Sequence, residues 1–530
     1  MTGVVRAHAA ARAGGGLLLL FPVVLLFVLS WQKSYTGDEG LTVQLASGPY
    51  RQLIENVGAD FHMPGYHTLL WAISHLAGSS LLVMRLLSLA LVLLMLILAA
   101  RSLPLPAAVL LALSPFTLHL ALEVRMYGLL ALCGLLTMMA WQGYERAGSG
   151  RSLFALALSL ALGTWVHYFA WTCTAAVVLG LAIERRWKQA LVVLCLVLLL
   201  FLPWAGRALE RVSSGQEALP AGVPGLEMRA TPAGRLLGAP FSIAGTALRF
   251  AAGNAVFDFG QWGIRQLTLG SVAGGLLGLA LLFLAVRGIR RSSLITKLLA
   301  LVPLVALSLV RPSARHFAMA YPAYMVLAAE GLPSGRRART ALVACLSILM
   351  ILLCVPYVSR STIPQRSTHD RDFLEVARLS DSLRVEEPVP LVIFLDTYST
   401  LGISRHLLEL GFPDSLVWHP HMQRFGQERF FCSLREGLAY LQMDTDSLVG
   451  VWLGLAPGGG GFLLVANRPD TSRSARAFGS GENLFSGLGS DVMADLDLME
   501  ALAVRVSVQE IDLRGSEGPM GLFLCRPPAP

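Results

Sequence analysis

The chain has 530 residues, of which 55% are hydrophobic and only 14% are charged, and its mean hydropathy is +0.61. Soluble globular domains carry about 25% charged residues, so this composition excludes a soluble globular protein and indicates an integral membrane protein. The net charge of +8 does not indicate nucleic acid as a partner, because it is unevenly distributed. Residues 360–530 hold 15 arginines and 22 acidic residues, whereas the rest of the chain holds 27 basic and 12 acidic residues. The basic residues therefore belong mainly to the membrane part, where topology and an anionic inner leaflet favour them.

Apolar stretches recur along the first 358 residues, and most approach the roughly 20 residues that a helix needs to cross a bilayer. The first stretch follows two arginines but precedes no small-x-small cleavage site, so we interpret it as a retained anchor rather than a secretory signal. The pattern predicts about eleven transmembrane helices: Gly14–Trp31, Leu81–Ala100, Leu105–His119, Arg125–Tyr144, Ser152–His167, Tyr168–Ile183, Gln189–Trp204, Leu267–Val286, Ser293–Val310, His316–Leu332 and Thr340–Val358.

Two arginines precede the first predicted span, and arginine, in one case with lysine, then falls in every second turn between spans. The positive-inside rule places these turns and the amino terminus in the cytoplasm. An odd number of spans then puts the loop after the first span, and everything after Val358, on the exoplasmic side. Lysine occurs only at positions 33, 188 and 297 while arginine is abundant, which is typical of a GC-rich bacterial genome. We therefore predict a multi-pass protein of a bacterial inner (plasma) membrane with a periplasmic carboxy-terminal part.

Two segments interrupt the helical pattern. Gly206–Arg265 is rich in glycine and proline, and we expect it to form a long substrate-binding or lid loop. In residues 359–530, PVPLVIFLD, LVGVWLGLA and GLFLCRPP are typical of strands and TYSTLGISRHLLEL is typical of a helix. We therefore predict a transmembrane domain (1–358, with exoplasmic loops 32–80 and 206–265) and a small soluble α/β domain (359–530).

Two acids, Asp38 and Glu39, follow the first span in the segment TGDEGLT. Carboxylates at a membrane boundary are costly unless they have a function. A carboxylate can take a proton from an acceptor hydroxyl, and the planar fork of arginine suits a departing phosphate. This combination fits sugar transfer from a lipid phosphate, with Asp38 as the base and with Arg125 and Arg315 holding the phosphate. The other polar candidates on the predicted exoplasmic face are His62, Tyr66, His67, Arg85, Glu123, Tyr127, His167, Tyr168, Arg311 and His316.

Each candidate also has a structural interpretation. Asp38 could cap a helix, and Glu39 could be an ordinary surface charge or a supporting group. Glu123 and Arg125 could form an ion pair at a helix end. Arg85 could extend its side chain to the lipid headgroups.

Four segments in this order resemble the membrane glycosyltransferases of the GT-C superfold: TGDEGLT, FHMPGYHTLLWAISHLAGSSLLVMRLLSLA, LEVRMYGLLAL and WVHYFAW. Within that superfold they are similar to the group of protein O-mannosyltransferases, lipid A aminoarabinose transferases and rhizobial lipopolysaccharide galacturonosyltransferases. The resemblance covers roughly residues 15–335. It implies a polyprenyl-phosphate-linked sugar as donor, a lipid, glycan or protein as acceptor, and an inverting single displacement.

The resemblance places the family's first-loop acid on Asp38, with Glu39 beside it. The histidine of a His-Pro-Pro-like segment falls on His62, although Met63 replaces the first proline. Some members of the superfold use a divalent cation and others do not, so the resemblance assigns no metal and no other cofactor.

The family's Glu-x-Arg-x-Tyr element and His-Tyr pair also have equivalents, although Leu122 stands where glutamine often precedes the glutamate. These equivalents are Glu123, Arg125 and Tyr127, followed by His167 and Tyr168. We therefore predict catalytic roles for Asp38, Glu39 and Glu123, and substrate binding by His62, Tyr66, Arg125, Tyr127, His167, Tyr168 and Arg315.

Two other functions fit parts of the pattern. A transporter or flippase of a lipid-linked saccharide would also need polar groups, but it favours inverted repeats and charges near the midplane of the membrane, and no repeat is visible. A non-catalytic scaffold of an envelope assembly would tolerate loss of Asp38.

Overall fold

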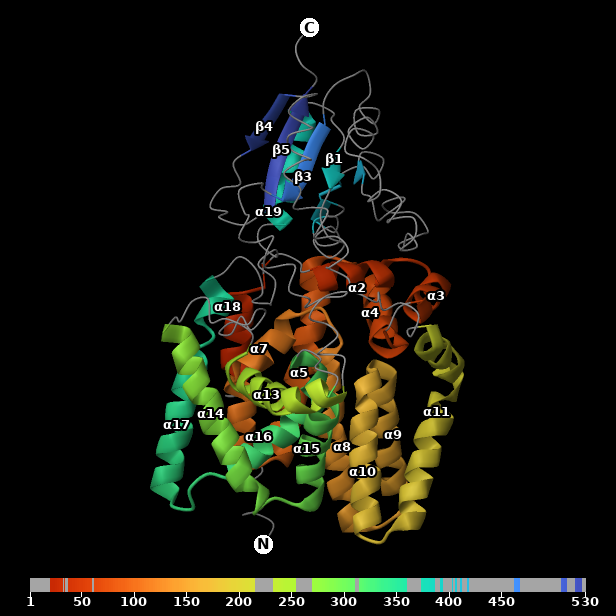
Figure 1. The fold of residues 1–530 in the computed structure, drawn as a ribbon, viewed down its shortest axis with the longest axis vertical. Coiled ribbons are helices and arrows are strands. Elements are labelled where there is room, and N and C mark those ends of the chain that lie inside the picture. The colour runs from red at the N-terminus through yellow and green to blue at the C-terminus, as the bar shows by residue number, and fades with distance from the viewer. Residues whose placement is uncertain are drawn as a thin grey trace.

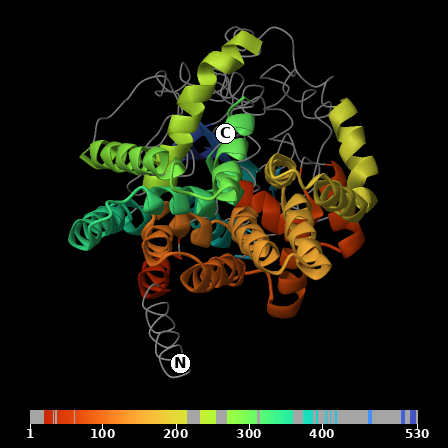
Figure 2. The same ribbon diagram turned by 90° about the horizontal axis from the view of Figure 1, so that it is seen from below.

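The computed structural model describes residues 20–31, 33, 37–59, 62–214, 232–253, 269–309, 314–359, 373–386, 391–393, 403, 406–407, 410–411, 417–418, 462–467, 507–511 and 520–526. Helices packed side by side form the larger part of the molecule, and a β-sheet lies beyond one end of them (Figure 1). Viewed from the end opposite the sheet, the helices of residues 269–352 pack beside those of residues 81–183 (Figure 2).

Three helices lie across the end of the bundle that faces the sheet (Figure 1): α2 (Gly37–Ser47), α3 (Tyr50–Ala59) and α4 (Pro64–Ala77). The long helix α5 (Leu81–Ser102) follows, and its first turn is capped by Ser80, whose side chain accepts a hydrogen bond from the Val83 N–H. Serine is a favourable N-cap because its oxygen satisfies an N–H group that has no partner within the helix.

The predicted span Leu105–His119 is a broken one. It consists of α6 (Leu105–Leu113) and α7 (Pro115–Leu122), which are bent by 57° relative to each other. Pro115 has no N–H to continue the first helix, and the Ser114 side chain accepts a hydrogen bond from Phe116 N–H to start the second. Two residues after α7 ends, the Val124 N–H donates a hydrogen bond to Glu39 of α2 at 2.8 Å.

The rest of the helical part comprises α8 (Tyr127–Ala147), α9 (Gly150–Val166), η1 (Tyr168–Ala170), α10 (Trp171–Ile183), α11 (Trp187–Ser214), α13 (Pro232–Ala252), α14 (Leu269–Ile289), α15 (Leu294–Ser308), η2 (Ala314–Ala320), α16 (Tyr321–Glu330), α17 (Arg336–Leu352) and α18 (Val355–Ser359).

The prediction of a long loop over Gly206–Arg265 is wrong for the described part of that segment. Helix α11 continues to Ser214, and α13 occupies residues 232–252. In α13, Phe250 is buried against the bundle whereas Phe241 is exposed, so one face of the helix packs and the other does not. Glycine and proline at scattered positions concealed this amphipathic pattern in the sequence.

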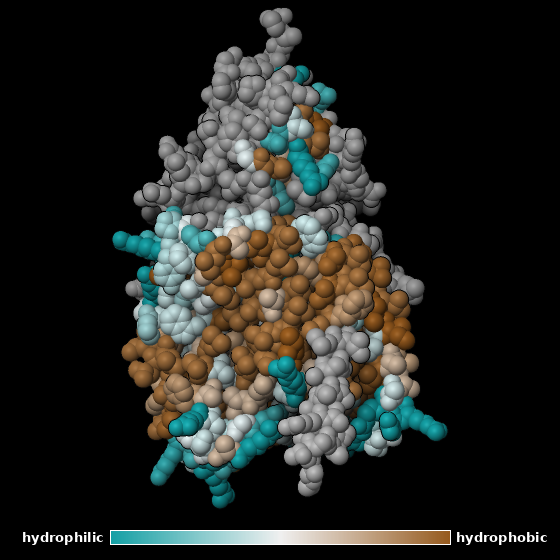
Figure 3. Space-filling view, turned by 180° about the vertical axis from the view of Figure 1, so that it is seen from behind, coloured by the Kyte–Doolittle hydropathy of each residue, from teal (hydrophilic) through white to brown (hydrophobic). Residues whose placement is uncertain are grey.

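Several helices are suited to a membrane. Four are long and apolar enough to cross one, namely Leu81–Ser102, Trp187–Leu209, Val272–Ile289 and Arg336–Val358, and the bent pair α6–α7 would be a fifth. Large apolar side chains cover much of the surface of the helical part, and hydrophilic residues gather at its lower end (Figure 3). The predicted number of eleven spans is not reached among the described residues, because apolar helices such as α9 and α15 have only 17 and 15 residues.

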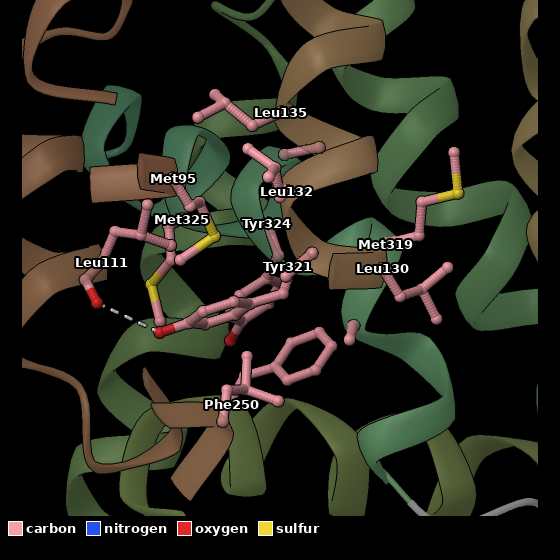
Figure 4. Close-up of a cluster of buried hydrophobic side chains, with 14 of the residues drawn as sticks. Met95, Leu111, Leu130, Leu132, Leu135, Phe250, Met319, Tyr321, Tyr324 and Met325 are labelled. Atoms are coloured by element: carbon pink, nitrogen blue, oxygen red, sulfur yellow. Dashed lines mark hydrogen bonds between the residues drawn. The ribbon is translucent and has the colours of Figure 1, made fainter. Parts of the chain in front are cut away.

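A core of aromatic and methionine side chains joins α13 and α16 to the earlier helices α6 and α7 (Figure 4). Phe250 of α13 packs on Tyr321 of α16, with their ring centroids 5.0 Å apart. The Tyr321 hydroxyl lies 2.9 Å from the Thr117 hydroxyl of α7 and donates to the Leu111 carbonyl of α6 at 3.4 Å. This core holds η2 and α16 against the helices that carry the candidate site.

Helices α14 and α16 approach so closely that only glycine fits at two contact points. A Cβ added at Gly288 would collide with the backbone carbonyl of Leu327, and one added at Gly331 would collide with that of Leu284. Glycine at helix interfaces allows backbones to approach in this way in membrane proteins.

The sheet has the strand order β2-β1-β3-β5-β4. β1 (Leu391–Ile393) is parallel to β2 (Val417–Trp418) and β3 (Phe462–Asn467), whereas β5 (Met520–Arg526) is antiparallel to β3 and to β4 (Ser507–Ile511). Helix α19 (Phe373–Glu386) lies beside it (Figure 1). β1 and β5 confirm the strands predicted in PVPLVIFLD and GLFLCRPP. The strand predicted in LVGVWLGLA lies outside the described residues, as does most of TYSTLGISRHLLEL, so the complete α/β domain and its boundaries stay predictions.

The α14–α16 contact gives a test of the packing. Gly288→Val should lower stability by about 1–3 kcal/mol or more, because the new side chain meets a backbone carbonyl that cannot move aside. Gly143→Val in α8 is the matched control, since nothing lies within 4 Å of a Cβ at that position. Thermal unfolding of both purified variants in detergent measures the difference, and equal melting temperatures would contradict the proposed contact.

Candidate active site

Polar side chains, most of them buried, gather where α2 crosses the ends of the bundle helices. They come from α2, the segment before α4, α5, α7, the linker between α7 and α8, the start of α8, the turn before η1, and η2. The described members are Glu39, Thr42, His62, Arg85, His119, Glu123, Arg125, Tyr127, His167, Arg315 and His316.

Glu39 is completely buried and holds α2 to two other elements. Its carboxylate forms an ion pair with Arg85 of α5 at 3.3 Å and accepts a hydrogen bond from the Val124 N–H at 2.8 Å. Arg85 is equally buried and also donates to the backbone carbonyls of Trp31 and Lys33, at 2.5 and 2.6 Å. Glu39 is therefore not an ordinary surface charge, and Arg85 does not extend to the lipid headgroups. These contacts favour a positioning role for both residues.

Arg125 joins the α7–α8 linker to the segment before α4. Its guanidinium donates to the Thr42 hydroxyl at 2.7 Å and lies 3.0 Å from His62 Nε2. The His62 ring stands edge-on to the His67 ring, with centroids 5.3 Å apart. His67 in turn lies 3.0 Å from the Met63 carbonyl through Nδ1.

Glu123 follows the last residue of α7 and is buried between two basic groups. One carboxylate oxygen pairs with Arg315 of η2, and the other lies 3.3 Å from His119 Nε2, one helical turn earlier. The Glu123 backbone carbonyl accepts a hydrogen bond from Ser88 of α5 at 2.9 Å. The sequence suggested an ion pair between Glu123 and Arg125, but the ion pairs of Glu123 are with Arg315 and His119.

These basic neighbours decide the charge of Glu123. Burial raises the pKa of the carboxyl group, but the charges of Arg315 and His119 outweigh that effect and hold the pKa at about 2. Glu123 is thus a stable anion at neutral pH. A carboxylate with so low a pKa is a weak general base.

Two arginines of the cluster, Arg125 and Arg315, lie near the Tyr127 ring. The Arg315 guanidinium lies 5.1 Å from the ring centroid and that of Arg125 lies 5.9 Å away, both within the range of a cation–π interaction. The Tyr127 hydroxyl lies 3.2 Å from His316 Nε2. The Tyr127 ring therefore contacts two guanidinium groups, and its own hydroxyl contacts His316.

His167 and His316 continue the cluster beyond Tyr127. Their ring centroids are 5.2 Å apart, and the Phe169 ring lies 5.5 Å from that of His316. His167 Nδ1 accepts a hydrogen bond from the Phe169 N–H at 3.1 Å, so in the neutral ring the proton sits on Nε2. In that form the ring presents Nε2–H as a donor.

Three more predicted residues relate to this cluster in different ways. The Tyr66 ring lies 6.0 Å from that of His67, and Tyr66 is close enough to Glu39, Glu123 and Arg125 to interact with their charges. Tyr168 packs instead into an apolar cluster with Met63, between α3 and α11. The backbone of Asp38 lies in α2 beside Glu39, but its side chain lies outside the described residues.

Two members of the cluster were not among the sequence-based candidates. Thr42 follows Glu39 by three residues and His119 precedes Glu123 by four, so both share a helix face with a predicted acid. That spacing was the available signal. Arg311, which was a candidate, lies outside the described residues. No group of three or more histidine, cysteine, aspartate or glutamate side chains that could hold a metal ion occurs within the described ranges.

Removing the Glu39 carboxylate tests its positioning role. Glu39→Ala leaves the buried Arg85 charge without its counter-ion, and such a loss typically costs about 3–5 kcal/mol. Glu55→Ala is the matched control, because Glu55 pairs with Arg51 at the exposed surface of α3, where the cost is about 0–1 kcal/mol. Comparable melting temperatures for the two variants in detergent would argue against a buried ion pair.

The low pKa of Glu123 predicts how stability depends on pH. Because the folded-state pKa of about 2 lies below the ordinary 4.5, its stabilisation is fully present above about pH 4.5 and is lost as the pH falls toward 2. Glu123→Gln should therefore be less stable than the wild type at pH 7, and the difference should shrink across this acidic range. Unfolding curves at several pH values measure it, and a difference that does not depend on pH would contradict the assigned ion pairs.

No protein-family model matches the sequence, and no curated protein matches it. Among solved structures, ArnT from Cupriavidus metallidurans in the apo state matches with a TM-score of 0.53 and 13% identity, over 97% of this chain and 98% of that chain. The structure of ArnT bound to undecaprenyl phosphate also gives 0.53, with 14% identity and the same coverage. The archaeal oligosaccharyltransferase AglB from Archaeoglobus fulgidus matches with a TM-score of 0.46 and 14% identity, over 96% of this chain and 74% of that chain.

At 13% and 14% identity, the two ArnT structures establish a similarity of fold. The alignments cover nearly the whole of both chains. The chain has the GT-C fold that its sequence motifs suggested.

Proposed function

We propose that this protein is a membrane glycosyltransferase that moves a sugar from a polyprenyl-phosphate donor to a lipid, glycan or protein acceptor on the periplasmic face. The single observation that carries the proposal is the placement of Arg125 and Arg315 around Tyr127. Two guanidinium groups held at a membrane boundary suit a lipid-linked phosphate, which needs charge compensation where it meets the protein. The fold supports the same proposal, because ArnT has a similar fold and its structure has been solved with undecaprenyl phosphate bound.

The reaction is an inverting single displacement. An acceptor oxygen attacks the anomeric carbon of the sugar, the bond from that carbon to the phosphate oxygen breaks, and the polyprenyl phosphate leaves with the bonding electron pair. The acceptor proton passes to a carboxylate. Arg125 and Arg315 stabilise the negative charge that develops on the phosphate, which is the kind of electrostatic assistance that contributes most to such steps.

Asp38 is the proposed base, because the other two acids are already engaged. Glu39 is bound to Arg85 and to a backbone N–H, and Glu123 is held between Arg315 and His119. Asp38 lies one residue before Glu39 in α2, so the Glu39 contacts fix its backbone next to the cluster. Glu123 and Glu39 would act by positioning Arg315 and α2.

His62, Tyr127 and His167 would bind substrate. His62 lies against the Arg125 guanidinium, and Tyr127 and His167 present a hydroxyl and an Nε2–H next to the arginines. These groups would orient the sugar or the phosphate through hydrogen bonds. Tyr66 would support His67, whose ring lies next to its own, and Tyr168, which packs in the apolar cluster, would contact the lipid part of a substrate.

A test of the function compares cells that lack the protein with cells complemented by wild type, Asp38→Asn or Glu55→Gln. Mass spectrometry of lipid extracts and surface glycans should show one glycan that lacks a single sugar in the deletion strain, together with accumulation of its polyprenyl-phosphate donor. Wild type and Glu55→Gln should restore the glycan, because Glu55 lies at the exposed surface of α3. Asp38→Asn should accumulate to normal levels and fail to restore it.

Other outcomes separate the alternatives. Full restoration by Asp38→Asn would exclude Asp38 as the base. A saccharide lipid that accumulates intact, with no glycan lacking one sugar, would favour a transporter or flippase. An unchanged glycan and lipid profile in the deletion strain would favour a scaffold.

A further inference from the structure

Six arginines gather at the end of the bundle opposite the candidate active site, in the last turn of α14, in the turn between α14 and α15, and at the start of α17. All six side chains are exposed. Hydrophilic residues are concentrated at this end of the helical part (Figure 3). We call this set the arginine edge: Arg287, Arg290, Arg291, Arg336, Arg337 and Arg339.

The arginine edge has two groups of arginines, one at the end of α14 and one at the start of α17, and backbone contacts hold the two groups together. Gly288, next to Arg287, packs directly on the backbone of α16, and Gly331 packs on that of α14. Arg291 donates to the backbone carbonyls of Glu330 and Leu332, at 3.3 and 3.1 Å. The two groups of arginines therefore lie side by side on a rigid junction, and their spacing is fixed by packing.

The arginine edge lacks acidic partners in the part of the chain that the structure describes. None of its six residues forms an ion pair there. The nearby Glu330 carboxylate accepts a hydrogen bond from Ser292 instead. In the α10–α11 turn at the same end of the bundle, Arg186 pairs with Glu184 at 3.5 Å and lies over the Tyr144 ring. The positive-inside rule accounts for basic residues in both turns, but only the arginine edge brings arginines of two adjacent elements together.

Lipid-facing apolar side chains adjoin the arginine edge. Phe283 and Val286 of α14 are 65% and 58% exposed, and they lie within about one turn of Arg287. Helix α17 packs against α14, and its residue Ile348 is 60% exposed. A bound molecule could therefore place negative charge on the arginines and hydrocarbon along the two helices.

We propose that the arginine edge is a binding site for an anionic phospholipid, with its phosphates on the guanidinium groups and its acyl chains along α14 and α17. Arginine binds phosphate through two parallel hydrogen bonds, and basic clusters between transmembrane helices bind phospholipid headgroups. Arginines in two adjacent turns suit a headgroup with two phosphates best. The proposal does not depend on the enzymatic function, because the arginine edge lies at the other end of the bundle.

Native mass spectrometry of the full chain, released from micelles that contain phosphatidylcholine and cardiolipin, tests the site. Wild type should retain cardiolipin. Arg287→Gln/Arg290→Gln and Arg336→Gln/Arg337→Gln should each reduce the retained fraction by about tenfold or more, since each charge near a membrane surface contributes appreciably to lipid affinity. Arg146→Gln/Arg151→Gln removes the same charge from the exposed α8–α9 turn and should leave retention unchanged.

Two further measurements keep the outcomes distinct. Melting temperatures without cardiolipin should be equal for wild type and variants, because the altered side chains are exposed. A lower melting temperature of the variants would show that they lose cardiolipin because they misfold, and this would overturn the proposal. Phosphatidylglycerol should compete with cardiolipin, whereas millimolar inorganic phosphate should not. Equal loss of cardiolipin in the control variant, or full competition by inorganic phosphate, would show non-specific attraction to charge and would also overturn it.

Discussion

Two carboxylates, Glu39 and Glu123, lie buried at one end of the helical bundle, and each is compensated by an arginine from a different element. Transfer of a charged group from water into a protein costs several kcal/mol, and only close opposite charges and hydrogen bonds offset that cost. The charges are therefore satisfied only when α2, α5, the α7–α8 linker and η2 are all in place. The same contacts that close this end of the bundle also bring the candidate catalytic groups together.

The packing below the cluster makes this arrangement stable. The bend at Ser114–Pro115 ends α7 where Glu123 can reach Arg315. The Tyr321 hydroxyl binds both segments of the bent span from the side of α16. An apolar and aromatic core thus fixes the backbone on which the charged groups depend, and the charged groups in turn fix α2, which carries Asp38.

The two ends of the molecule use arginine in different ways. At the candidate active site, Arg315 is tied to the Glu123 carboxylate, so its guanidinium group is ordered before any substrate arrives. At the arginine edge, the side chains are exposed and the backbone beneath them is rigid. Ordered guanidinium groups suit a reacting phosphate, whose geometry changes little during transfer, whereas exposed ones suit a lipid headgroup that exchanges with the bilayer.

The sequence by itself determined the broad class of the protein, because composition and apolar run length depend on individual residues and their order. It also identified Glu123, Arg125, Tyr127 and Arg315 as members of one cluster. It did not determine the pairing within that cluster: the neighbouring Glu123 and Arg125 suggested an ion pair, while the carboxylate is held by Arg315, which is 192 residues away. It missed His119 and Thr42, and it left open whether Arg85 belongs to the polar candidates or extends to the headgroups, whereas the side chain is buried against Glu39. Only the tertiary structure decided these points, because ion pairs depend on distances in space and on burial, which order along the chain does not specify.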